Sequence, residues 1–364
     1  MPPKRVGILT GGGDAPGLNA VIRASVKSAL KLGWQVTGIR QGFAGLLKPG
    51  LTQNLGSEDV MNILHLGGTI LGTSNRDNPF AYPVKEKNRW AVKDYSGEVL
   101  RNFRALRLDA LIAIGGDGTM AIAFELFKRG LPVVGVPKTI DNDVVGTVIT
   151  FGFDTAVSTA TEAIDRLHST AQSHRRVMVV EVMGRNSGWI ALHSGISGGA
   201  DAILIPEIPF KLDVLCDEVE KRYARRGPQY GMIVAAEGAF PLRGHVRTIK
   251  TRERGRQLPT LGGIADYLAR QIHKKTKREC RSIVLGHLQR GGMPTTFDRL
   301  LSTRFGSAAV RLIQDGKFGH MVASRPPKIT SIAMSRVIGR VKRVPLNSDI
   351  IRSARNLDIS FGDR

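Results

Sequence analysis

Short apolar runs, rich in valine and isoleucine, alternate with longer stretches of helical periodicity along most of this chain. The runs cover residues 6–9, 110–114, 133–136, 177–182, 202–205, 232–235 and 283–285. In most of them apolar residues occupy consecutive positions rather than alternate ones, which is typical of strands covered on both faces. The alternation therefore predicts an α/β fold with mostly parallel sheets.

The number of these runs exceeds what one modest sheet needs, and 364 residues can bury more than one core. We therefore expect two doubly wound, Rossmann-like domains and a C-terminal extension over residues 338–364. A helix is expected over residues 18–32, because its apolar positions share one face and Gly33 follows. Residues 75–95 and 242–260 are expected to be loops, the second with a basic stretch at 252–256.

The amino-acid composition indicates a folded globular protein. Apolar residues make up 42% and charged residues 23%, an ordinary globular balance. No apolar run approaches the roughly 20 residues of a membrane span, and the first strand begins too early to leave room for a cleaved signal. Cys216 and Cys280 have neither metal-ligand spacing nor a disulfide pattern, so we expect a reducing cytoplasm.

The net charge of +22 has three interpretations. It could attract nucleic acid, concentrate phosphorylated small molecules in a basic cleft, or simply keep the surface solvated. The basic tracts lack interleaved aromatic residues on which bases could stack. We therefore favour a mixture of the last two and expect neither a nucleic acid nor a membrane as partner.

The first glycine-rich segment, residues 11–17, follows the strand at 6–9. Gly12 and Gly17 have the glycine spacing of a P-loop, but Leu18 and Asn19 replace its Lys-Ser/Thr, and Pro16 breaks the dinucleotide pattern. Glycines before a helix still let backbone N–H groups approach a phosphate. The alternative is a tight turn that binds nothing.

The second glycine-rich segment, residues 115–119, reads Gly-Gly-Asp-Gly-Thr between a predicted strand and a predicted helix. Glycines on both sides of Asp117 place a carboxylate and backbone donors together, an arrangement that suits Mg²⁺ bound to a polyphosphate. Asp117 could instead cap its own helix. A cap would not require three glycines, which favours the phosphate site.

Thr139, Asp141 and Asp143 follow the next predicted strand. Two close carboxylates are costly unless a cation or a substrate proton accompanies them, so one could act as general base on a hydroxyl. An Asx-turn explains one aspartate but not two. Basic residues also recur near strand ends and indicate a second phosphate-bearing substrate: Arg176, Arg185, Arg281, His287 and Arg290.

These segments, in this order, resemble the 6-phosphofructokinase family over nearly the whole chain. They are the glycine loop at 11–17, Gly-Gly-Asp-Gly-Thr at 115–119, Pro-Lys-Thr-Ile-Asp-Asn-Asp at 137–143, Glu-Val-Met-Gly-Arg at 181–185 and Leu-Gly-His-Leu-Gln-Arg-Gly-Gly at 285–292. Gly-Gly-Asp-Gly also occurs in lipid and NAD kinases, whereas the ordered set is specific. The resemblance implies phosphoryl transfer from ATP to the C1 hydroxyl of fructose 6-phosphate.

The resemblance also implies roles for individual residues. Asp141 would take the proton of the attacking hydroxyl, with Thr139 and Asp143 beside it, and Asp117 would hold Mg²⁺. Arg185, and Arg76 from the opposite side, would neutralise charge on the transferred group. The nucleotide phosphates would be lined by Gly12, Gly116, Gly118 and Thr119.

Fructose 6-phosphate would be held by Met183, Gly184, Glu237, His287 and Arg290. Arg176 and Arg281 match positions that reach in from a neighbouring subunit, so the resemblance implies a homotetramer or at least a dimer. The expected division is a nucleotide-binding domain over 1–152 and 289–338. A sugar-phosphate-binding domain would cover 153–288, with the extension at 339–364.

The phosphoryl donor is ATP or pyrophosphate in this family. Gly118 favours ATP, because a glycine leaves room for the α-phosphate that a carboxylate would crowd and repel. Lys138 favours pyrophosphate, whose users carry lysine there, although some ATP-users carry it too. We expect ATP, with pyrophosphate-dependent phosphofructokinase as the alternative; a non-catalytic nucleic-acid-binding or scaffold protein is a third hypothesis.

Regulated bacterial members bind ADP or phosphoenolpyruvate at a subunit interface. Residues that fit this effector site are Arg23, Lys27, Arg166, Asp201 and, roughly, Arg226. Pro228 and Tyr230 stand where cationic residues are expected. We therefore expect the effector pocket to be altered or silent.

Overall fold

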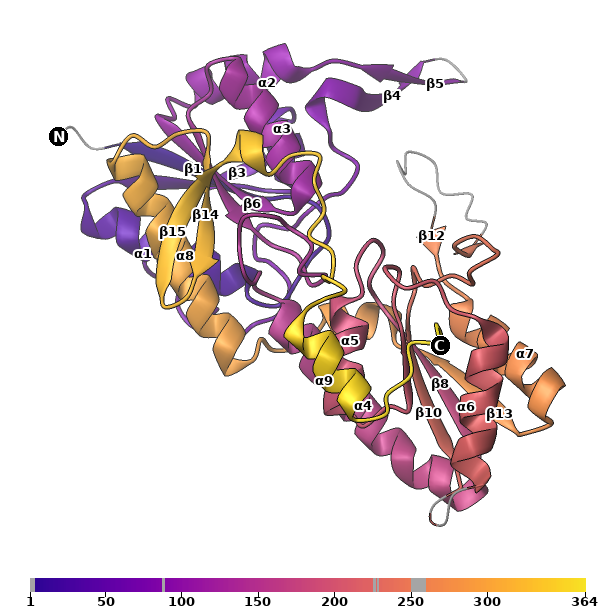
Figure 1. The fold of residues 1–364 in the computed structure, drawn as a ribbon. Coiled ribbons are helices and arrows are strands. Elements are labelled where there is room, and N and C mark those ends of the chain that lie inside the picture. The colour runs from indigo at the N-terminus through magenta and orange to yellow at the C-terminus, as the bar shows by residue number, and fades with distance from the viewer. Residues whose placement is uncertain (1–3, 87–88, 225–226, 228, 250–259) are drawn as a thin grey trace.

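The larger of two main sheets has seven strands in the order β15-β14-β7-β6-β1-β2-β3 (Figure 1). The structure is a computed structural model that describes residues 4–86, 89–224, 227, 229–249 and 260–364. The strands of this sheet are β1 (Arg5–Thr10), β2 (Gln35–Ile39), β3 (Thr52–Asn54), β6 (Ala110–Gly115), β7 (Val133–Pro137), β14 (His320–Arg325) and β15 (Lys328–Ala333). The central strands are parallel, whereas β3 and β15 pair antiparallel at the two edges.

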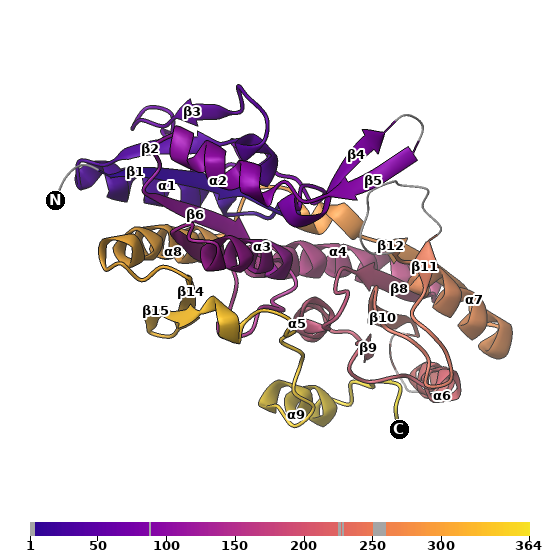
Figure 2. The same cartoon turned by 90° about the horizontal axis from the view of Figure 1, so that it is seen from above.

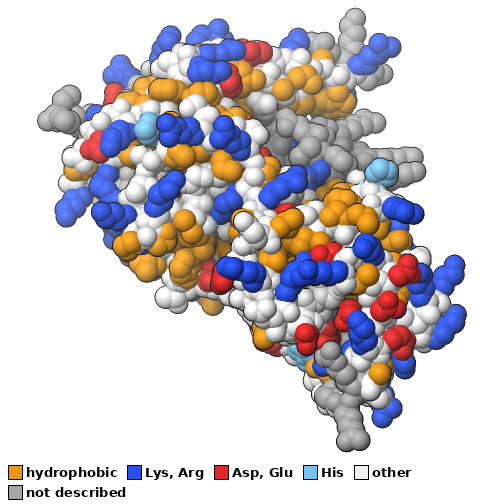
Figure 3. All heavy atoms as spheres, viewed as in Figure 1, with side chains coloured by type: hydrophobic (Ala, Val, Ile, Leu, Met, Phe, Trp, Pro, Cys, Tyr) orange, Lys and Arg blue, Asp and Glu red, His pale blue; other side chains and the backbone are white. Residues whose placement is uncertain are grey.

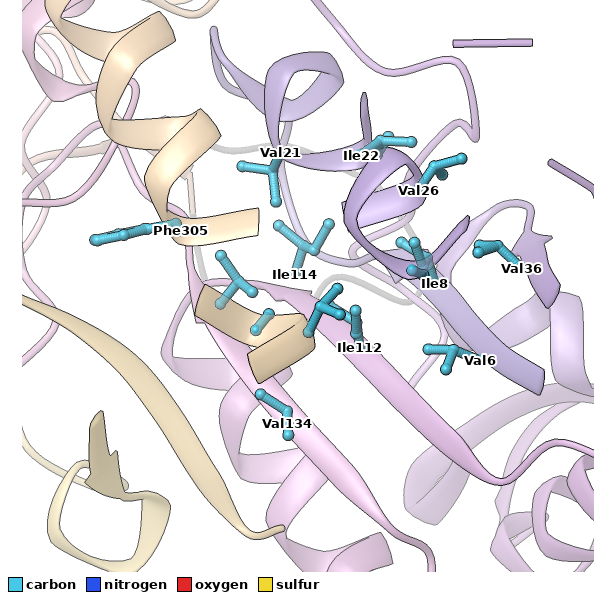
Figure 4. Close-up of a cluster of buried hydrophobic side chains, with 14 of the residues drawn as sticks. Val6, Ile8, Val21, Ile22, Val26, Val36, Ile112, Ile114, Val134 and Phe305 are labelled. Carbon is cyan, nitrogen blue, oxygen red and sulfur yellow. The ribbon is translucent and has the colours of Figure 1, made fainter. Parts of the chain in front are cut away.

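Helices cover both faces of this sheet. On one face α1 (Leu18–Lys31) and α8 (Thr296–Gln314) lie side by side, and on the other lie α2 (Ser96–Ala105) and α3 (Asp117–Lys128). Ile112 and Ile114 of β6 point to the first face with Phe305 of α8 (Figure 4), whereas Leu111 and Ala113 point to the second. Apolar residues at consecutive positions are thus buried in two different cores.

The smaller sheet contains four parallel strands in the order β13-β8-β10-β9. Its strands are β8 (Val177–Val182), β9 (Ala202–Leu204), β10 (Gly231–Ala236) and β13 (Cys280–Val284). One face packs against α4 (Phe153–His174) and α5 (Trp189–Ser197), and the other against α6 (Leu212–Ala224) and α7 (Ile264–Thr276). Figure 2 shows the two sheets with their helices as neighbouring layered units.

The predicted α/β fold with two mostly parallel sheets is confirmed, and each predicted strand is present within a few residues. Strands β2, β3, β14 and β15 were not predicted, because polar residues interrupt or replace their apolar patterns. The expectation that β13 is covered on both faces is wrong, because this edge strand is largely exposed, with Val284 at 57%.

The expectation of a loop at 75–95 is wrong. After the 3-10 turn η2 (Pro79–Ala81), β4 (Tyr82–Glu86) and β5 (Arg89–Lys93) form an antiparallel hairpin that projects from the body (Figure 1). Charged residues flank Trp90, Ala91 and Val92 in β5, and Trp90 and Val92 are both exposed, so this strand lacks the buried apolar run by which the core strands were predicted. In the second expected loop, β11 (Thr248–Ile249) pairs with β12 (Thr260–Leu261), and the basic stretch at 252–256 lies outside the described residues.

The C-terminal extension crosses from the larger sheet to the smaller one. It leaves β15 through the 3-10 turn η4 (Met334–Arg336), passes α9 (Asp349–Asn356) and reaches β9, where Ser360 bridges to Ala202. We propose that the two sheets mark the two domains expected from the sequence, 1–152 with 289–338 and 153–288 with 339–364.

Charged side chains are spread over the surface rather than gathered in one stripe on the face seen in Figure 3. Lys and Arg occur on both halves of that face, and Asp and Glu gather mainly over the region of α6 and α7. Among the helices that the structure describes, none combines the length and the apolar character needed to span a membrane.

Candidate active site

Two adjoining cavities lie at the carboxyl ends of the strands, where ligands bind in doubly wound folds. The first, of about 600 Å³, is lined mainly by segments that follow β1, β6 and β7. The second, of about 700 Å³, is lined by segments that follow β8, β10 and β13. Residues that line both cavities are Gly12, Gly13, Ser74, Asn75, Asp141, Arg185 and Arg290.

The glycine loop at 11–17 joins the two cavities. The Gly11 N–H donates to the carbonyl of Ile114 (2.8 Å) and the Gly12 N–H to the carbonyl of Ser74 (2.9 Å). Gly12 has φ 76° and Gly17, the N-cap of α1, has φ 102°, conformations that favour glycine. The loop therefore presents bare backbone to both cavities.

The segment at 115–119 forms the floor of the first cavity. A Cβ on Gly115 would lie 2.2 Å from Thr119 Oγ1, so only glycine fits there. Gly116 is the N-cap of α3 and Asp117 its first residue, so Asp117 is not the cap; its carboxylate accepts from the Gly118 N–H (2.7 Å). Asp117 and Gly118 are exposed, and a Cβ on Gly118 would meet nothing within 4 Å.

Asp141 and Asp143 follow β7 and line the first cavity. Their turn is closed by Thr139, whose Oγ1 accepts from the Asp141 N–H (3.1 Å). Burial raises the pKa of Asp141 to about 6. Burial and the charges of Asp141 and Asp117 raise the pKa of Asp143 to about 7. The buried Oδ1 of Asp141 has no hydrogen-bond partner among the described residues.

Lys138, immediately after β7, is almost fully buried and lines the first cavity. Its Nζ donates to the carbonyl of Gly13, and Nη1 of Arg290 donates to the carbonyl of Asp14 (2.9 Å). Burial, with the charge of Arg290, lowers the pKa of Lys138 to about 7. The two cations thus hold the glycine loop at the boundary between the cavities.

The second cavity combines acidic and basic groups. Met183 follows β8, Glu237 follows β10, and His287 and Arg290 lie on the 3-10 helix η3 (Gly286–Arg290) after β13. Burial and the charge of Glu181 raise the pKa of Glu237. Glu181 itself caps α7 by accepting from the N–H groups of Gly263 and Ala265 at 3.0–3.2 Å.

Most of the predicted site residues line one or both cavities. In this set are Gly12, Gly116, Asp117, Gly118, Thr119, Thr139, Asp141, Asp143, Met183, Arg185, Glu237, His287 and Arg290. Arg76 and Gly184 each follow a lining residue but line neither cavity. Arg176 and Arg281 lie near the opposite, amino ends of β8 and β13, where both pair with Glu279 (2.9 and 2.5 Å).

Several lining residues were missed by the sequence analysis. Apolar groups in the first cavity come from Phe43 in the 3-10 helix η1 (Gly42–Leu46), Phe80 in η2 and Ile122 in α3. They belong to segments separated by up to 79 residues, so no local pattern relates them. The polar residues Ser74 and Asn75 come from a stretch that reads only as loop.

The acidic groups fit a Mg²⁺ ion that a substrate helps to bind. Among the residues that the structure describes, no cluster of three or more His, Cys, Asp or Glu could hold a metal by itself. Asp141 nevertheless has an unpartnered buried oxygen, and Asp143 carries a pKa raised by its acidic neighbours. Mg²⁺ typically uses one or two carboxylates together with phosphate oxygens, so Asp117 with a bound polyphosphate is a suitable donor set.

Comparisons with known proteins agree with this geometry. A family model described as Phosphofructokinase matches residues 5–313. The chain is 51% identical over 360 residues to an ATP-dependent 6-phosphofructokinase of Chloroflexus aurantiacus, covering 99% of this chain and 98% of that protein. It is 49% identical over 344 residues to a pyrophosphate–fructose 6-phosphate 1-phosphotransferase of Amycolatopsis methanolica, covering 94% and 96%.

Solved structures show the same architecture. Phosphofructokinase from Pichia pastoris in the T-state superposes with a TM-score of 0.79 at 30% identity, covering 93% of this chain. This chain spans 35% of that longer yeast chain. A pyrophosphate-dependent phosphofructokinase from Nitrosospira multiformis superposes with a TM-score of 0.80 at 20% identity, which concerns the fold alone. By its family match, its sequence identity and its cavities, the chain belongs to the phosphofructokinase family.

Proposed function

We propose that this protein transfers the γ-phosphoryl group of ATP to the C1 hydroxyl of fructose 6-phosphate, giving fructose 1,6-bisphosphate and ADP. The observation that carries the proposal is the position of Asp141. It lines both the cavity with the glycine-rich segments and the cavity with His287 and Glu237. A carboxylate at that boundary can reach a reactant in either cavity, as a general base for transfer between them must.

Asp141 takes the proton of the C1 hydroxyl as the oxygen attacks. With a pKa of about 6, its carboxylate is ionised at neutral pH and still basic enough to accept a proton in a buried site. Arg185 also lines both cavities and can neutralise charge on the transferred group. Mg²⁺, when bound with the nucleotide beside Asp117, supplies charge neutralisation on the phosphate oxygens.

Fructose 6-phosphate occupies the second cavity in this proposal. Its 6-phosphate faces His287 and Arg290, and its hydroxyls face Glu237 and the backbone near Met183 and Gly184. Among these side chains, those of Met183, Glu237, His287 and Arg290 line that cavity. Gly184 contributes backbone: its φ of 137° and the hydrogen bond from the Gly238 N–H to its carbonyl (3.1 Å) shape the turn after β8.

ATP is the donor that the first cavity favours. Beyond Gly118, which leaves open space, the cavity continues to the apolar Phe43, Phe80 and Ile122. Such surface suits a nucleoside and offers nothing to pyrophosphate. Lys138, the residue that favours pyrophosphate, has its Nζ bonded to the carbonyl of Gly13.

A coupled assay with fructose 6-phosphate that compares ATP with pyrophosphate tests this proposal. We expect turnover with ATP and Mg²⁺, and at most slight turnover with pyrophosphate. Turnover with pyrophosphate at equal or better kcat/KM would establish the pyrophosphate alternative. No turnover with either donor would contradict the proposed function itself.

We infer that the active sites are shared between subunits of a homotetramer or dimer. Arg176 and Arg281 lie away from the cavities of their own chain and could serve a neighbouring one. The stretch 284–300, whose first residues line the second cavity, carries several exposed apolar side chains that could form an interface. They are Val284, Leu288, Met293, Phe297 and Leu300. Mixing inactive Asp141→Asn subunits with Arg281→Ala subunits should restore activity, because some hybrid sites contain both intact residues; no restoration would contradict sharing.

We also propose an altered or silent effector pocket in a cytoplasmic enzyme. Asp201 pairs with Arg222 (3.4 Å), and the hydroxyl of Tyr230 hydrogen-bonds to Nδ1 of His168 (3.0 Å), so these groups already have protein partners. Arg226 and Pro228 lie outside the described residues. Rates unchanged by ADP and phosphoenolpyruvate would support the proposal, whereas strong regulation by either would contradict it.

Cys216 and Cys280 are both free thiols, in keeping with a reducing compartment.

A further inference from the structure

The crossing segment at 341–344 runs directly behind the turn that carries Asp141 and Asp143. Val341 bridges antiparallel to Val144, and the Lys342 N–H donates to the carbonyl of Asp143 (2.7 Å). The crossing segment is itself anchored to the smaller sheet's side of the molecule. The Val344 N–H donates to Oε1 of Glu207 (2.9 Å), and Nε1 of Trp189 donates to the carbonyl of Lys342 (2.9 Å).

The ammonium group of Lys342 makes three hydrogen bonds to the same turn. Its Nζ donates to Oδ1 of Asn142 (2.7 Å), to the carbonyl of Thr147 (3.1 Å) and to the carbonyl of Val148 (2.8 Å). An ammonium has three donors, so this set uses all of them. The side chain also packs over the Trp189 ring, with Nζ 5.5 Å from its centroid.

Asn142 is the residue of this turn whose side chain Lys342 contacts. It separates the two carboxylates and has φ 52°, a left-handed conformation that is uncommon outside glycine. Its Oδ1 accepts from the Thr150 N–H (3.2 Å) as well as from Lys342. The conformation of Asn142 sets the direction in which the chain turns from Asp141 to Asp143.

We propose that Lys342 is a positioning residue for phosphoryl transfer, which holds Asn142 and the 142–148 turn so that Asp141 and Asp143 face the reactants. The inference rests on the proposed function of Asp141. Lys342 lines neither of the two cavities proposed to hold the reactants. Its loss should therefore lower kcat and leave the binding of ATP and fructose 6-phosphate nearly unchanged.

The test uses the full-length protein with Lys342→Met, Lys342→Arg and the control Arg343→Met. Arg343 is the next residue, is exposed and lines neither cavity. We expect Lys342→Met to lower kcat about tenfold to a hundredfold, as a misplaced catalytic group does, with both KM values within about threefold. Lys342→Arg should recover much of kcat because it keeps the charge and donors, and Arg343→Met should match the unmodified protein.

Trp189→Phe is the milder variant if Lys342→Met fails to fold. It removes the hydrogen bond to the Lys342 carbonyl and leaves a smaller ring beneath Nζ, and it should lower kcat about threefold at unchanged KM. An unchanged kcat in Lys342→Met would overturn the inference. If Lys342→Met does not fold, an unchanged kcat in Trp189→Phe would overturn it. So would a loss that appears only in KM. Inactivity of the unmodified protein would instead contradict the proposed function, which separates the two failures.

Discussion

The segments at 115–119 and 139–143 follow neighbouring parallel strands, yet they are held in place in different ways. Segment 115–119 is shaped largely by its own residues, although the Gly115 carbonyl also accepts from the Lys138 N–H (2.9 Å): Gly115 packs against Thr119, and Asp117 accepts from the Gly118 N–H. Segment 139–143 depends on distant residues. Ser187 donates to the carbonyl of Asp141 (3.2 Å), and Lys342 reaches Asn142 from 200 positions away.

The difference agrees with the ligand proposed for each segment. A polyphosphate can be held by backbone N–H groups at a helix N-terminus, which a local glycine pattern supplies. Carboxylates in a buried site disfavour their ionised forms: burial raises the pKa of Asp141, and burial with the charges of Asp141 and Asp117 raises the pKa of Asp143. Keeping them together requires a scaffold from the rest of the fold.

The sharpest test of segment 139–143 is Asp141→Asn. We expect kcat to fall by about 10²–10⁴, because the general base is lost, while both KM values change little. Steady-state kinetics with a coupled assay measure this, and binding of ATP to the variant serves as the control for an intact first cavity. A variant that keeps kcat and only weakens fructose 6-phosphate binding would show that Asp141 is not the base.

Gly118→Asp tests segment 115–119. A carboxylate at this open position should repel the α-phosphate and lower kcat/KM for ATP by about tenfold or more. Gly97→Asp is a matched control, since Gly97 is also the second residue of a helix, in α2, and also has open space at its Cβ position. Unchanged ATP kinetics in Gly118→Asp would refute the steric and electrostatic basis for the choice of donor.

Gly115→Ala tests how tightly segment 115–119 is packed. The new Cβ would lie 2.2 Å from Thr119 Oγ1, so we expect a loss of about 1–3 kcal/mol in the free energy of unfolding. Gly97→Ala, where nothing lies within 4 Å, should be neutral or slightly stabilising. Urea unfolding of both variants gives the comparison, and equal stabilities would mean that the segment is not constrained locally.

Asp143→Asn tests how far the neighbouring carboxylates lower the stability of the folded protein. The folded pKa of Asp143 is raised from 3.8 to about 7, so its protonated form stabilises the fold fully below pH 3.8, and this stability is lost as the pH rises to 7. Without nucleotide or Mg²⁺, the variant should therefore melt about 2 °C or more above the unmodified protein at pH 8. This difference in melting temperature should shrink towards pH 4. A difference that is constant or reversed would show that ionised Asp143 does not destabilise the fold.

The sequence predicted much of the fold and the residues that compose the site, for identifiable reasons. Strands such as β6 and β8 are apolar at consecutive positions, which requires cover on both faces. The hairpin β4–β5 was missed because Trp90 and Val92 are exposed and its charged residues resemble a loop. Phe43 and Phe80 were missed as cavity residues because only the tertiary fold brings their 3-10 turns beside α3.

By itself the sequence determined the parallel α/β units, the two glycine-rich loops and the aspartates that follow β7, since each depends on residues within a few positions of one another. Only the tertiary structure decided that Asp141 lies between the two cavities, that Arg176 and Arg281 lie away from them, and that Lys342 supports Asn142. The physical reason is the separation in sequence between the residues that interact. Helix termini and glycine turns are set by local backbone conformation, whereas a buried pair of like charges is held by hydrogen bonds that link distant parts of the chain.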